Sequence, residues 1–270
     1  MTEPVCASAP IGVFDSGVGG LSVLAAIRAE LPTESLLYLA DSAHAPYGDK
    51  SEAQIARRAR ACVAFLIEHG AKAIVVACNT ATVAAVTQLR AEFELPIVAM
   101  EPGIKPAVRM TRSGVVGVLA TAGTVRSQRF QALLVDHASG VDVVAQACPG
   151  LVEQVERGVF SAQETRALLN DYLQPLVCRG VDTLVLGCTH YPFLTATIQA
   201  LVGAETRVVD TGPAVAMQLR RRLEALDLTA VAGVVATVRY FTTGSVAGLR
   251  QFLATIGCAD CVVEFAVTGA

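Results

Sequence analysis

The feature that most constrains this chain is a regular alternation between short apolar segments and longer stretches of helical character. Apolar segments bounded by turn residues and separated by helices are typical of βαβ units with parallel strands. The sequence therefore predicts an α/β fold with parallel sheets. The expected strands are Ile11–Phe14, Leu36–Ala40, Ala73–Ala77, Ile97–Met100, Val115–Ala120, Val141–Ala145, Thr183–Gly187 and Arg207–Asp210.

The second four segments repeat the first four. The stretches around Cys78 and Cys188 share one pattern, in which a glycine precedes an apolar strand that ends at the cysteine. Upstream, Ser51 and Ser161 are separated by the same number of residues as the two cysteines, and each is expected to start a helix. Several such matches in one order indicate a duplicated α/β unit. We therefore expect two pseudo-symmetric parallel-sheet domains facing a central cleft.

The paired cysteines predict acid–base chemistry. In open α/β sheets ligands bind beyond the carboxyl ends of the strands, so each half would present one thiol to the cleft. Inverting a stereocentre by proton transfer needs a base on one face of the carbon and an acid on the other, and a thiol with a pKa of about 8.5 serves either role. Asp15 ends the first strand and His190 follows Cys188 by two residues, so both are candidate assisting groups. The pattern predicts an amino-acid racemase with Cys78, Cys188, Asp15 and His190 as catalytic residues.

Hydroxyl and amide side chains beside the expected cleft suit an anionic substrate, because such donors and helix N-termini bind carboxylates without an arginine. These candidate substrate-binding residues are Ser16, Asn79, Thr80, Thr121, Thr124 and Thr189.

No cofactor or metal is expected. A pyridoxal enzyme needs a Schiff-base lysine, and of the three lysines only Lys50 lies near an expected cleft edge. The glycine-rich turn Asp15–Gly20 does not match the GxGxxG dinucleotide motif. All eight cysteines are expected to be reduced thiols, with Cys62 and Cys178 buried. The CxxC at Cys258–Cys261 lacks a second ligand pair for zinc.

Composition narrows the class further. The chain is 53% hydrophobic, yet no uninterrupted apolar run reaches the roughly 18 residues of a membrane-spanning helix. A net charge of −3 gives no basic surface for nucleic acid. The N-terminus lacks the pattern of a secretory signal, so we expect a cytoplasmic protein that binds neither membrane nor nucleic acid.

A set of short motifs runs along nearly the whole chain: Phe14–Gly20, Pro46–Gly48, Ala77–Ala81, Ala120–Thr124 with Ser127, Cys148–Pro149, Gly187–Pro192 and Phe241–Gly244. In these motifs the sequence resembles the glutamate racemases of bacterial cell-wall synthesis, within the aspartate/glutamate racemase family. One departure is Glu153, where many relatives have proline.

The resemblance implies interconversion of L- and D-glutamate without a cofactor, with D-glutamate going into peptidoglycan. Cys188 would take the proton from L-glutamate and Cys78 from D-glutamate, with Glu156 supporting the network of Asp15 and His190. It also implies two α/β domains, residues 1–100 with 211–270 and residues 101–210. The residues implied to contact substrate are Asp15, Ser16, Tyr47, Gly48, Asn79, Thr80, Thr189 and His190.

Three alternatives stay open on sequence alone. The first is a racemase of aspartate or a hydantoin, although aspartate racemases typically carry an acidic residue where this chain has His190. The second is a thiol hydrolase with Cys188 as nucleophile, which the short spacing to His190 makes awkward and which leaves Cys78 without a role. The third is a binding role, since some glutamate racemases inhibit DNA gyrase. The oligomeric state is also open, with a homodimer as one option.

Overall fold

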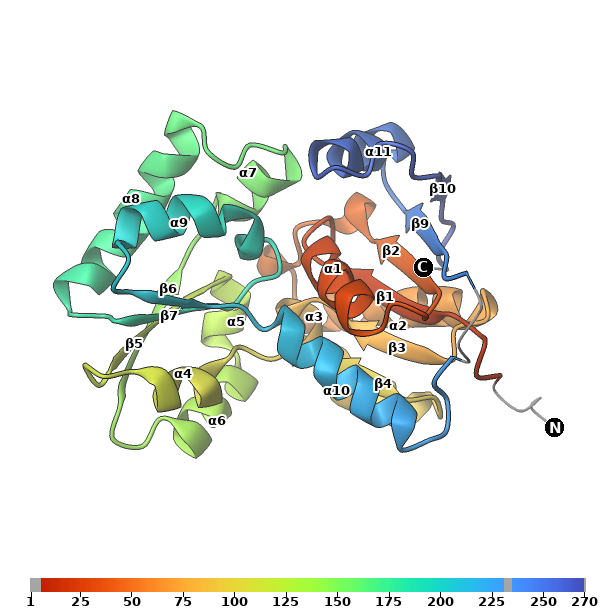
Figure 1. The fold of residues 1–270 in the computed structure, drawn as a ribbon, viewed down its shortest axis with the longest axis horizontal. Coiled ribbons are helices and arrows are strands. Elements are labelled where there is room, and N and C mark those ends of the chain that lie inside the picture. Colours follow the sequence, from red (N-terminus) through yellow and green to blue (C-terminus); the bar gives the residue numbers. More distant parts are fainter. Residues whose placement is uncertain (1–5, 231–234, 270) are drawn as a thin grey trace. The chain divides into compact units, whose positions relative to one another are not determined.

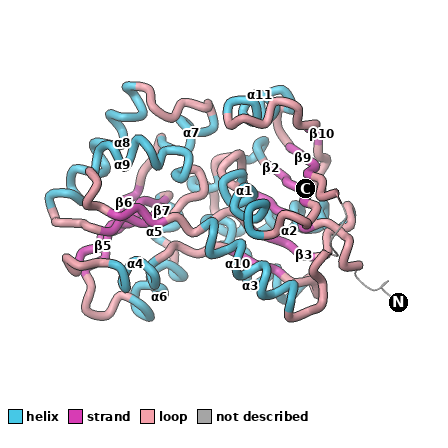
Figure 2. The backbone as a smooth tube through the Cα atoms, in the orientation of Figure 1, coloured by secondary structure: helices cyan, strands magenta, loops and turns pink. Residues whose placement is uncertain are grey.

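The computed structural model describes residues 6–230 and 235–269. Its backbone divides into two compact units, each made of a parallel sheet with helices on both sides (Figures 1 and 2). Unit 1 comprises Met1–Met100 and Gly212–Ala270, and unit 2 comprises Glu101–Thr211.

Unit 1 contains a six-stranded parallel sheet with the order β10-β9-β2-β1-β3-β4. Every residue of β1, β2 and β3 is buried, as expected for parallel strands that helices cover on both faces. The strands are β1 (Ile11–Asp15), β2 (Leu36–Ala40), β3 (Ala73–Val76), β4 (Ile97–Ala99), β9 (Val238–Thr242) and β10 (Val263–Phe265).

The helices of unit 1 form two main pairs. Helices α1 and α10 pack side by side, and α2 packs against α3 (Figure 1). Helix α2 starts at a capping box, in which Ser51 and Gln54 each accept the other's backbone N–H. The helices are α1 (Leu21–Glu30), α2 (Glu52–Glu68), α3 (Asn79–Glu92), α10 (Gly212–Glu224), α11 (Val246–Thr255) and the short 3₁₀ turns η1 (Ser42–His44) and η2 (Tyr47–Asp49).

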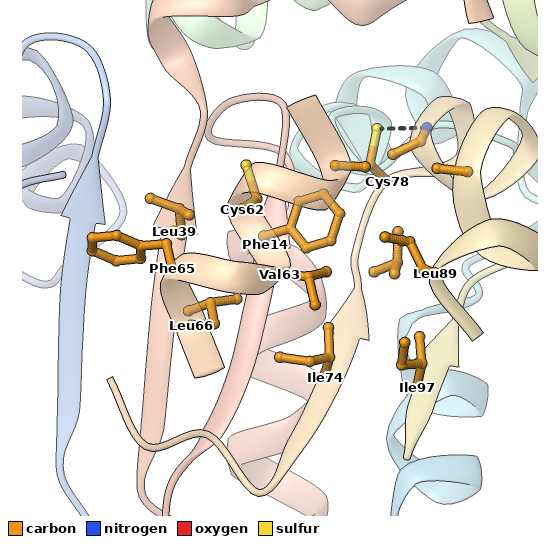
Figure 3. Close-up of a cluster of buried hydrophobic side chains, with 14 of the residues drawn as sticks. Phe14, Leu39, Cys62, Val63, Phe65, Leu66, Ile74, Cys78, Leu89 and Ile97 are labelled. Carbon is orange, nitrogen blue, oxygen red and sulfur yellow. Dashed lines mark hydrogen bonds between the residues drawn. The ribbon is translucent and has the colours of Figure 1, made fainter. Parts of the chain in front are cut away.

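One face of this sheet packs on α2 and α3 and forms a hydrophobic core of unit 1. Alternate strand residues such as Phe14, Leu39 and Ile74 meet α2 residues such as Val63 (Figure 3). Cys78 lies at the end of the same cluster, where β3 passes into α3. The core therefore fixes the backbone from which this thiol projects.

Unit 2 contains a four-stranded parallel sheet with the order β6-β5-β7-β8, the same order as β2-β1-β3-β4 in unit 1. Helices α8 and α9 lie on one side of it and α4 and α6 on the other (Figure 1). The predicted fold class, α/β with two parallel sheets, is confirmed. The elements are β5 (Val115–Ala120), β6 (Asp142–Ala147), β7 (Thr183–Leu186), β8 (Arg207–Val209), α4 (Ile104–Met110), α5 (Ala122–Arg126), α6 (Gln128–His137), α7 (Leu151–Glu156), α8 (Gln163–Cys178), η3 (Tyr191–Leu194) and α9 (Thr195–Val202).

All eight expected strands are present, and the fold contains two further strands that were not predicted. Strands β9 and β10 extend the sheet of unit 1 beyond β2. The expected helix start at Ser161 was wrong, because α8 begins at Gln163 with Ala162 as its N-cap. Among the described residues, no helix combines the length and the apolar character needed to cross a membrane.

Two expectations about the cysteines were also wrong. Cys258 and Cys261 are joined as a disulfide, since the turn after α11 brings their Cα atoms to 5.9 Å, a usual separation for bridged cysteines. Cys178 is exposed at the end of α8, whereas Cys62 is buried as expected.

Candidate active site

Cys78 occupies the junction between β3 and α3. It is the N-cap residue of α3, and its Sγ accepts a hydrogen bond from the backbone N–H of Ala81 at 3.5 Å (dashed line in Figure 3). The side chain is only 5% exposed. A helix N-terminus favours negative charge, so this position suits a thiolate.

Asp15 is linked to Cys78 through Ser16. Strand β1 pairs with β3 in parallel, so Asp15 at the end of β1 and Cys78 after β3 lie at the same edge of the sheet. Oδ1 of Asp15 accepts from the backbone N–H of Ser16 at 2.7 Å and from its hydroxyl at 3.3 Å, and the Ser16 hydroxyl lies 3.8 Å from Sγ of Cys78. Oδ2 accepts from the backbone N–H of Gly20 at 2.5 Å. A Cβ on Gly20 would lie 2.7 Å from Cβ of Asp15, so glycine permits this close turn.

Asn79 and Thr80 start α3 beside Cys78. Both are buried, at 3% and 7% exposure. Neither the amide oxygen nor the amide nitrogen of Asn79 has a hydrogen-bond partner among the residues that the structure describes. Buried polar atoms are nearly always hydrogen-bonded, so Asn79 stays a candidate for contact with a ligand.

Tyr47 is part of a buried network around Asp41. The Tyr47 hydroxyl donates to Oδ2 of Asp41 at 2.6 Å, and the side chain is 1% exposed. Burial, with a smaller contribution from the neighbouring Cys62 and Asp41, raises the pKa of Tyr47 far above its usual value. The phenol is therefore a neutral donor. Gly48 follows in the same 3₁₀ turn, η2, which packs against α3.

Cys188 lies in unit 2, in the turn between β7 and η3. Its side chain is 6% exposed, and its carbonyl accepts from the backbone N–H of Tyr191 at 3.1 Å. The preceding Gly187 donates to the carbonyl of Leu119 at 2.7 Å, and a Cβ there would lie 2.9 Å from that oxygen. Glycine thus allows the strand end to approach β5 closely. Cys188 precedes a 3₁₀ turn, whereas Cys78 caps an α-helix.

His190 connects Cys188 to Glu156. Its Nδ1 lies 3.7 Å from Sγ of Cys188, and its Nε2 lies 2.7 Å from Oε1 of Glu156. Burial lowers the pKa of His190, but hydrogen bonds to Cys188 and Glu156 outweigh this and hold it well above its ordinary value. The view that the short spacing makes a direct Cys–His contact awkward was therefore wrong.

Three threonines complete the candidate residues of unit 2. Thr121 caps α5 at the end of β5, where its hydroxyl accepts from the backbone N–H of Thr124 at 3.2 Å and donates to the Thr124 hydroxyl at 3.0 Å. Thr189 is 2% exposed between Cys188 and His190. Strands β5 and β7 are neighbours, so Thr121 and Cys188 lie at the same sheet edge.

The candidate residues thus form two groups, one in each unit. Unit 1 holds Cys78 with Asp15, Ser16, Tyr47, Gly48, Asn79 and Thr80, and unit 2 holds Cys188 with Thr121, Thr124, Glu156, Thr189 and His190. Three residues that hold Tyr47 in place were not predicted from the sequence: Asp41, Arg58 and Thr243. Two of them had a sequence signal: Asp41 directly follows an expected strand, and Thr243 lies in the Phe241–Gly244 motif. Arg58 had none.

Comparison with known proteins identifies the family of the chain. The Asp/Glu/Hydantoin racemase family model matches residues 11–219. The chain is 54% identical to a glutamate racemase from Stutzerimonas stutzeri, covering 96% of this chain and 97% of the relative. It is 56% identical to a glutamate racemase from Pseudomonas aeruginosa, covering 87% and 89%.

Solved structures of glutamate racemases have the same fold. Glutamate racemase RacE1 from Bacillus anthracis aligns with a TM-score of 0.88 at 32% identity, over 96% of this chain and 97% of that one. Escherichia coli glutamate racemase, solved in complex with L-glutamate and the activator UDP-MurNAc-ala, aligns with a TM-score of 0.85 at 34% identity, over 97% and 100%. The chain therefore belongs to the Asp/Glu/Hydantoin racemase family and is an isomerase of the glutamate racemase type.

Proposed function

We propose that this isomerase interconverts L- and D-glutamate without a cofactor, with Cys78 and Cys188 as the acid–base pair. The observation that carries the proposal is that two buried cysteines follow equivalent strands, β3 and β7, of two sheets with one strand order. The substrate follows from the relatives, which are glutamate racemases, and from the E. coli structure, which is a complex with L-glutamate.

The proposed reaction needs the two sulfurs to act on opposite faces of one Cα. Starting from L-glutamate, the Cys188 thiolate removes the Cα proton and the Cys78 thiol delivers a proton to the other face. The product is D-glutamate, Cys188 is left as the thiol and Cys78 as the thiolate, so no net proton is gained or lost. The reverse reaction starts from this second protonation state.

Different groups would assist the two thiols in proton transfer. At Cys188, a protonated His190 held by Glu156 would donate a hydrogen bond toward the sulfur that acts as the base. At Cys78, the Ala81 N–H and the Ser16 hydroxyl lie next to the sulfur, and Asp15 orients Ser16. We therefore expect the two directions of the reaction to respond differently to substitution of these residues.

Binding of the substrate carboxylates would use neutral donors. The Asn79 amide is the leading candidate, because its polar atoms are buried and have no hydrogen-bond partner in residues 6–230 and 235–269. The hydroxyls of Ser16, Thr80, Thr121, Thr124 and Thr189 would join it. The Tyr47–Gly48 segment would contribute its backbone, because the Tyr47 hydroxyl already donates to Asp41.

The biological role proposed is the supply of D-glutamate for peptidoglycan in the cytoplasm. The contact between Cys188, His190 and Glu156 would also suit a thiol hydrolase, but that chemistry gives no role to Cys78.

Incubation of the purified, cofactor-stripped protein with L-glutamate in deuterium oxide tests the proposal. Deuterium should enter at Cα while the optical rotation decays to zero. Parallel reactions with L-aspartate and a hydantoin identify the substrate. Exchange on aspartate or the hydantoin but not on glutamate would overturn the substrate assignment, and dependence on added pyridoxal phosphate would overturn the cofactor-free mechanism.

A further inference from the structure

We propose that Arg58 is a positioning residue for the Cys78 side of the reaction, and that the C-terminal segment Ala266–Gly269 holds Arg58 in place. The inference rests on the proposed racemisation and extends it to residues that contact neither sulfur in the network described above. It follows a chain of contacts from Thr268 through Arg58, Asp41 and Tyr47 to the surroundings of Cys78, all within unit 1.

The first contact is a buried ion pair between Arg58 and Asp41. Nε of Arg58 donates to Oδ2 of Asp41 at 3.1 Å, and Nη2 donates to Oδ1 at 2.9 Å. The side chains are 11% and 0% exposed. Two parallel hydrogen bonds from a planar guanidinium fix the orientation of a carboxylate, which the single ammonium of a lysine does not.

Asp41 uses the same two oxygens to fix two other segments. Oδ2 accepts from the hydroxyl of Tyr47 at 2.6 Å, and Oδ1 accepts from the hydroxyl of Thr243 at 2.9 Å. Thr243 follows β9 and its hydroxyl accepts in turn from the backbone N–H of Ala43 at 3.2 Å. Rotation of the carboxylate would therefore disturb the turn that carries Tyr47 and the end of β9 together.

Tyr47 links the Asp41 carboxylate to the surroundings of Cys78 through packing. The 3₁₀ turn that contains Tyr47 packs against α3, whose N-cap is Cys78. Tyr47 and Cys78 also belong to one cluster of buried side chains. The position of the Tyr47 ring thus helps to set the space around this sulfur and the approach of Gly48.

Arg58 is held from its other side by the C-terminal segment. Its Nη2 donates to the Thr268 hydroxyl at 2.5 Å, and its Nη1 donates to the Gly269 carbonyl at 3.4 Å. The backbone N–H of Ala266 donates to the carbonyl of Thr242, which fastens this segment to β9. The segment thereby limits the conformations of the guanidinium that pairs with Asp41.

The test compares Arg58→Lys with Arg60→Lys. Both residues lie on α2, but Arg60 is 66% exposed and pairs with Glu92 on the surface. We expect kcat/KM of Arg58→Lys to fall about tenfold or more, the effect of losing one good hydrogen bond to a charged group. Arg60→Lys should stay within about twofold of the wild type, because exposed ion pairs contribute little.

The isotope effect separates positioning from general loss of structure. With D-glutamate deuterated at Cα, Cys78 would remove the deuteron, so slowing of this step in Arg58→Lys should raise the primary isotope effect on kcat/KM. With L-glutamate deuterated at Cα, Cys188 would remove the deuteron and Cys78 would act in the other step. The isotope effect should then fall, because removal of the deuteron becomes less rate-limiting. An equal change from both enantiomers, or kinetics like those of Arg60→Lys in a folded Arg58→Lys protein, would overturn the proposal.

A second variant keeps the inference testable if Arg58→Lys does not fold. Thr268→Val removes one hydroxyl at the partly exposed C-terminal segment and should lower kcat/KM about threefold, with the same direction of isotope effects, because one hydrogen bond is lost. Wild-type kinetics in Thr268→Val would contradict the role of this segment. Absence of glutamate racemisation by the wild type would instead refute the proposed function.

Discussion

Nε2 of His190 lies 2.7 Å from Oε1 of Glu156, on the side of the ring opposite to Cys188. His190 is 2% exposed, so its charged form depends on these two partners. Although burial lowers the pKa of His190, the hydrogen bonds to Cys188 and Glu156 raise it well above its ordinary value. Glu156 is therefore expected to keep a charged imidazole next to the Cys188 sulfur.

Substitution Glu156→Gln should lower kcat for L-glutamate about tenfold, because an amide does not stabilise the imidazolium as a carboxylate does. In single-turnover experiments, the rate constant for removal of the Cα proton should fall more for L-glutamate than for D-glutamate. The reason is that Cys188 would act as the base only on the L-enantiomer. Glu153→Gln is the matched control, because Glu153 is an exposed carboxylate on the same helix. Equal losses in the two variants would contradict the assignment.

The raised pKa of His190 also predicts a pH dependence of stability. A group whose pKa is higher in the folded state contributes its full stabilisation below the unfolded pKa, about 6.5 for histidine, and loses it as pH rises through the folded value. The wild type should therefore exceed His190→Gln in melting temperature most at about pH 6, and the difference should shrink as the pH rises through the higher pKa of the folded state. A difference that grows with pH would show that His190 is neutral in the folded protein.

The strands of both units were predictable because buried parallel strands leave a local signal. In β2, for example, all five residues are apolar and buried. Strand β9 gives a weaker signal, since it contains the exposed Arg239, and its pairing with β2 joins residues about 200 positions apart in the chain. Local periodicity carries no information on such pairing, so β9 and the short β10 were missed.

In the candidate site, too, local sequence patterns located some residues but not the contacts that depend on tertiary structure. The duplicated pattern located Cys78 and Cys188, because each follows an apolar strand. It did not show the Cys188–His190 contact, which depends on a turn: His190 has helical backbone angles, φ −74° and ψ −30°, that bring its ring back toward the sulfur. The pairing of Asp41 with Arg58 depends on how α2 packs beside the sheet, which the sequence pattern does not specify.

The two-thiol proposal predicts that Cys78→Ala and Cys188→Ala each lower kcat/KM for racemisation by about 10³-fold or more, since each removes one acid–base group. Each variant should stay folded, because the change removes only the sulfur and its hydrogen and leaves the backbone and Cβ in place. Cys178→Ala is the control, as this thiol is exposed at the end of α8. Melting curves report folding, and turnover of either variant near the wild-type rate would refute the mechanism.

Asp182 has no role in the proposed reaction, but its hydrogen bonds predict an effect on the stability of the fold. Its carboxylate accepts from the Thr111 hydroxyl and from the backbone N–H groups of Arg112 and Ser113, each at 2.7 Å, and thereby closes the turn before β5. Burial would raise the pKa of Asp182, but these hydrogen bonds and one from Thr183 hold it well below the usual range. Charged Asp182 thus stabilises the folded state above the unfolded pKa of about 3.9, and this stabilisation is lost as pH falls through the folded value.

Asp182→Asn should therefore lower the free energy of unfolding by about 1 kcal/mol near neutral pH, a modest value because the group is partly exposed. Racemase activity should be unchanged at temperatures where the variant is folded. The deficit relative to the wild type should narrow in acid, as Asp182 of the wild type becomes protonated. The control is Asp171→Asn, at an exposed position of α8, which should not alter the unfolding curve. Urea titrations of the wild type and both variants at several pH values provide the measurement. A deficit that stays constant down to the lowest pH would show that the charge of Asp182 does not stabilise the turn.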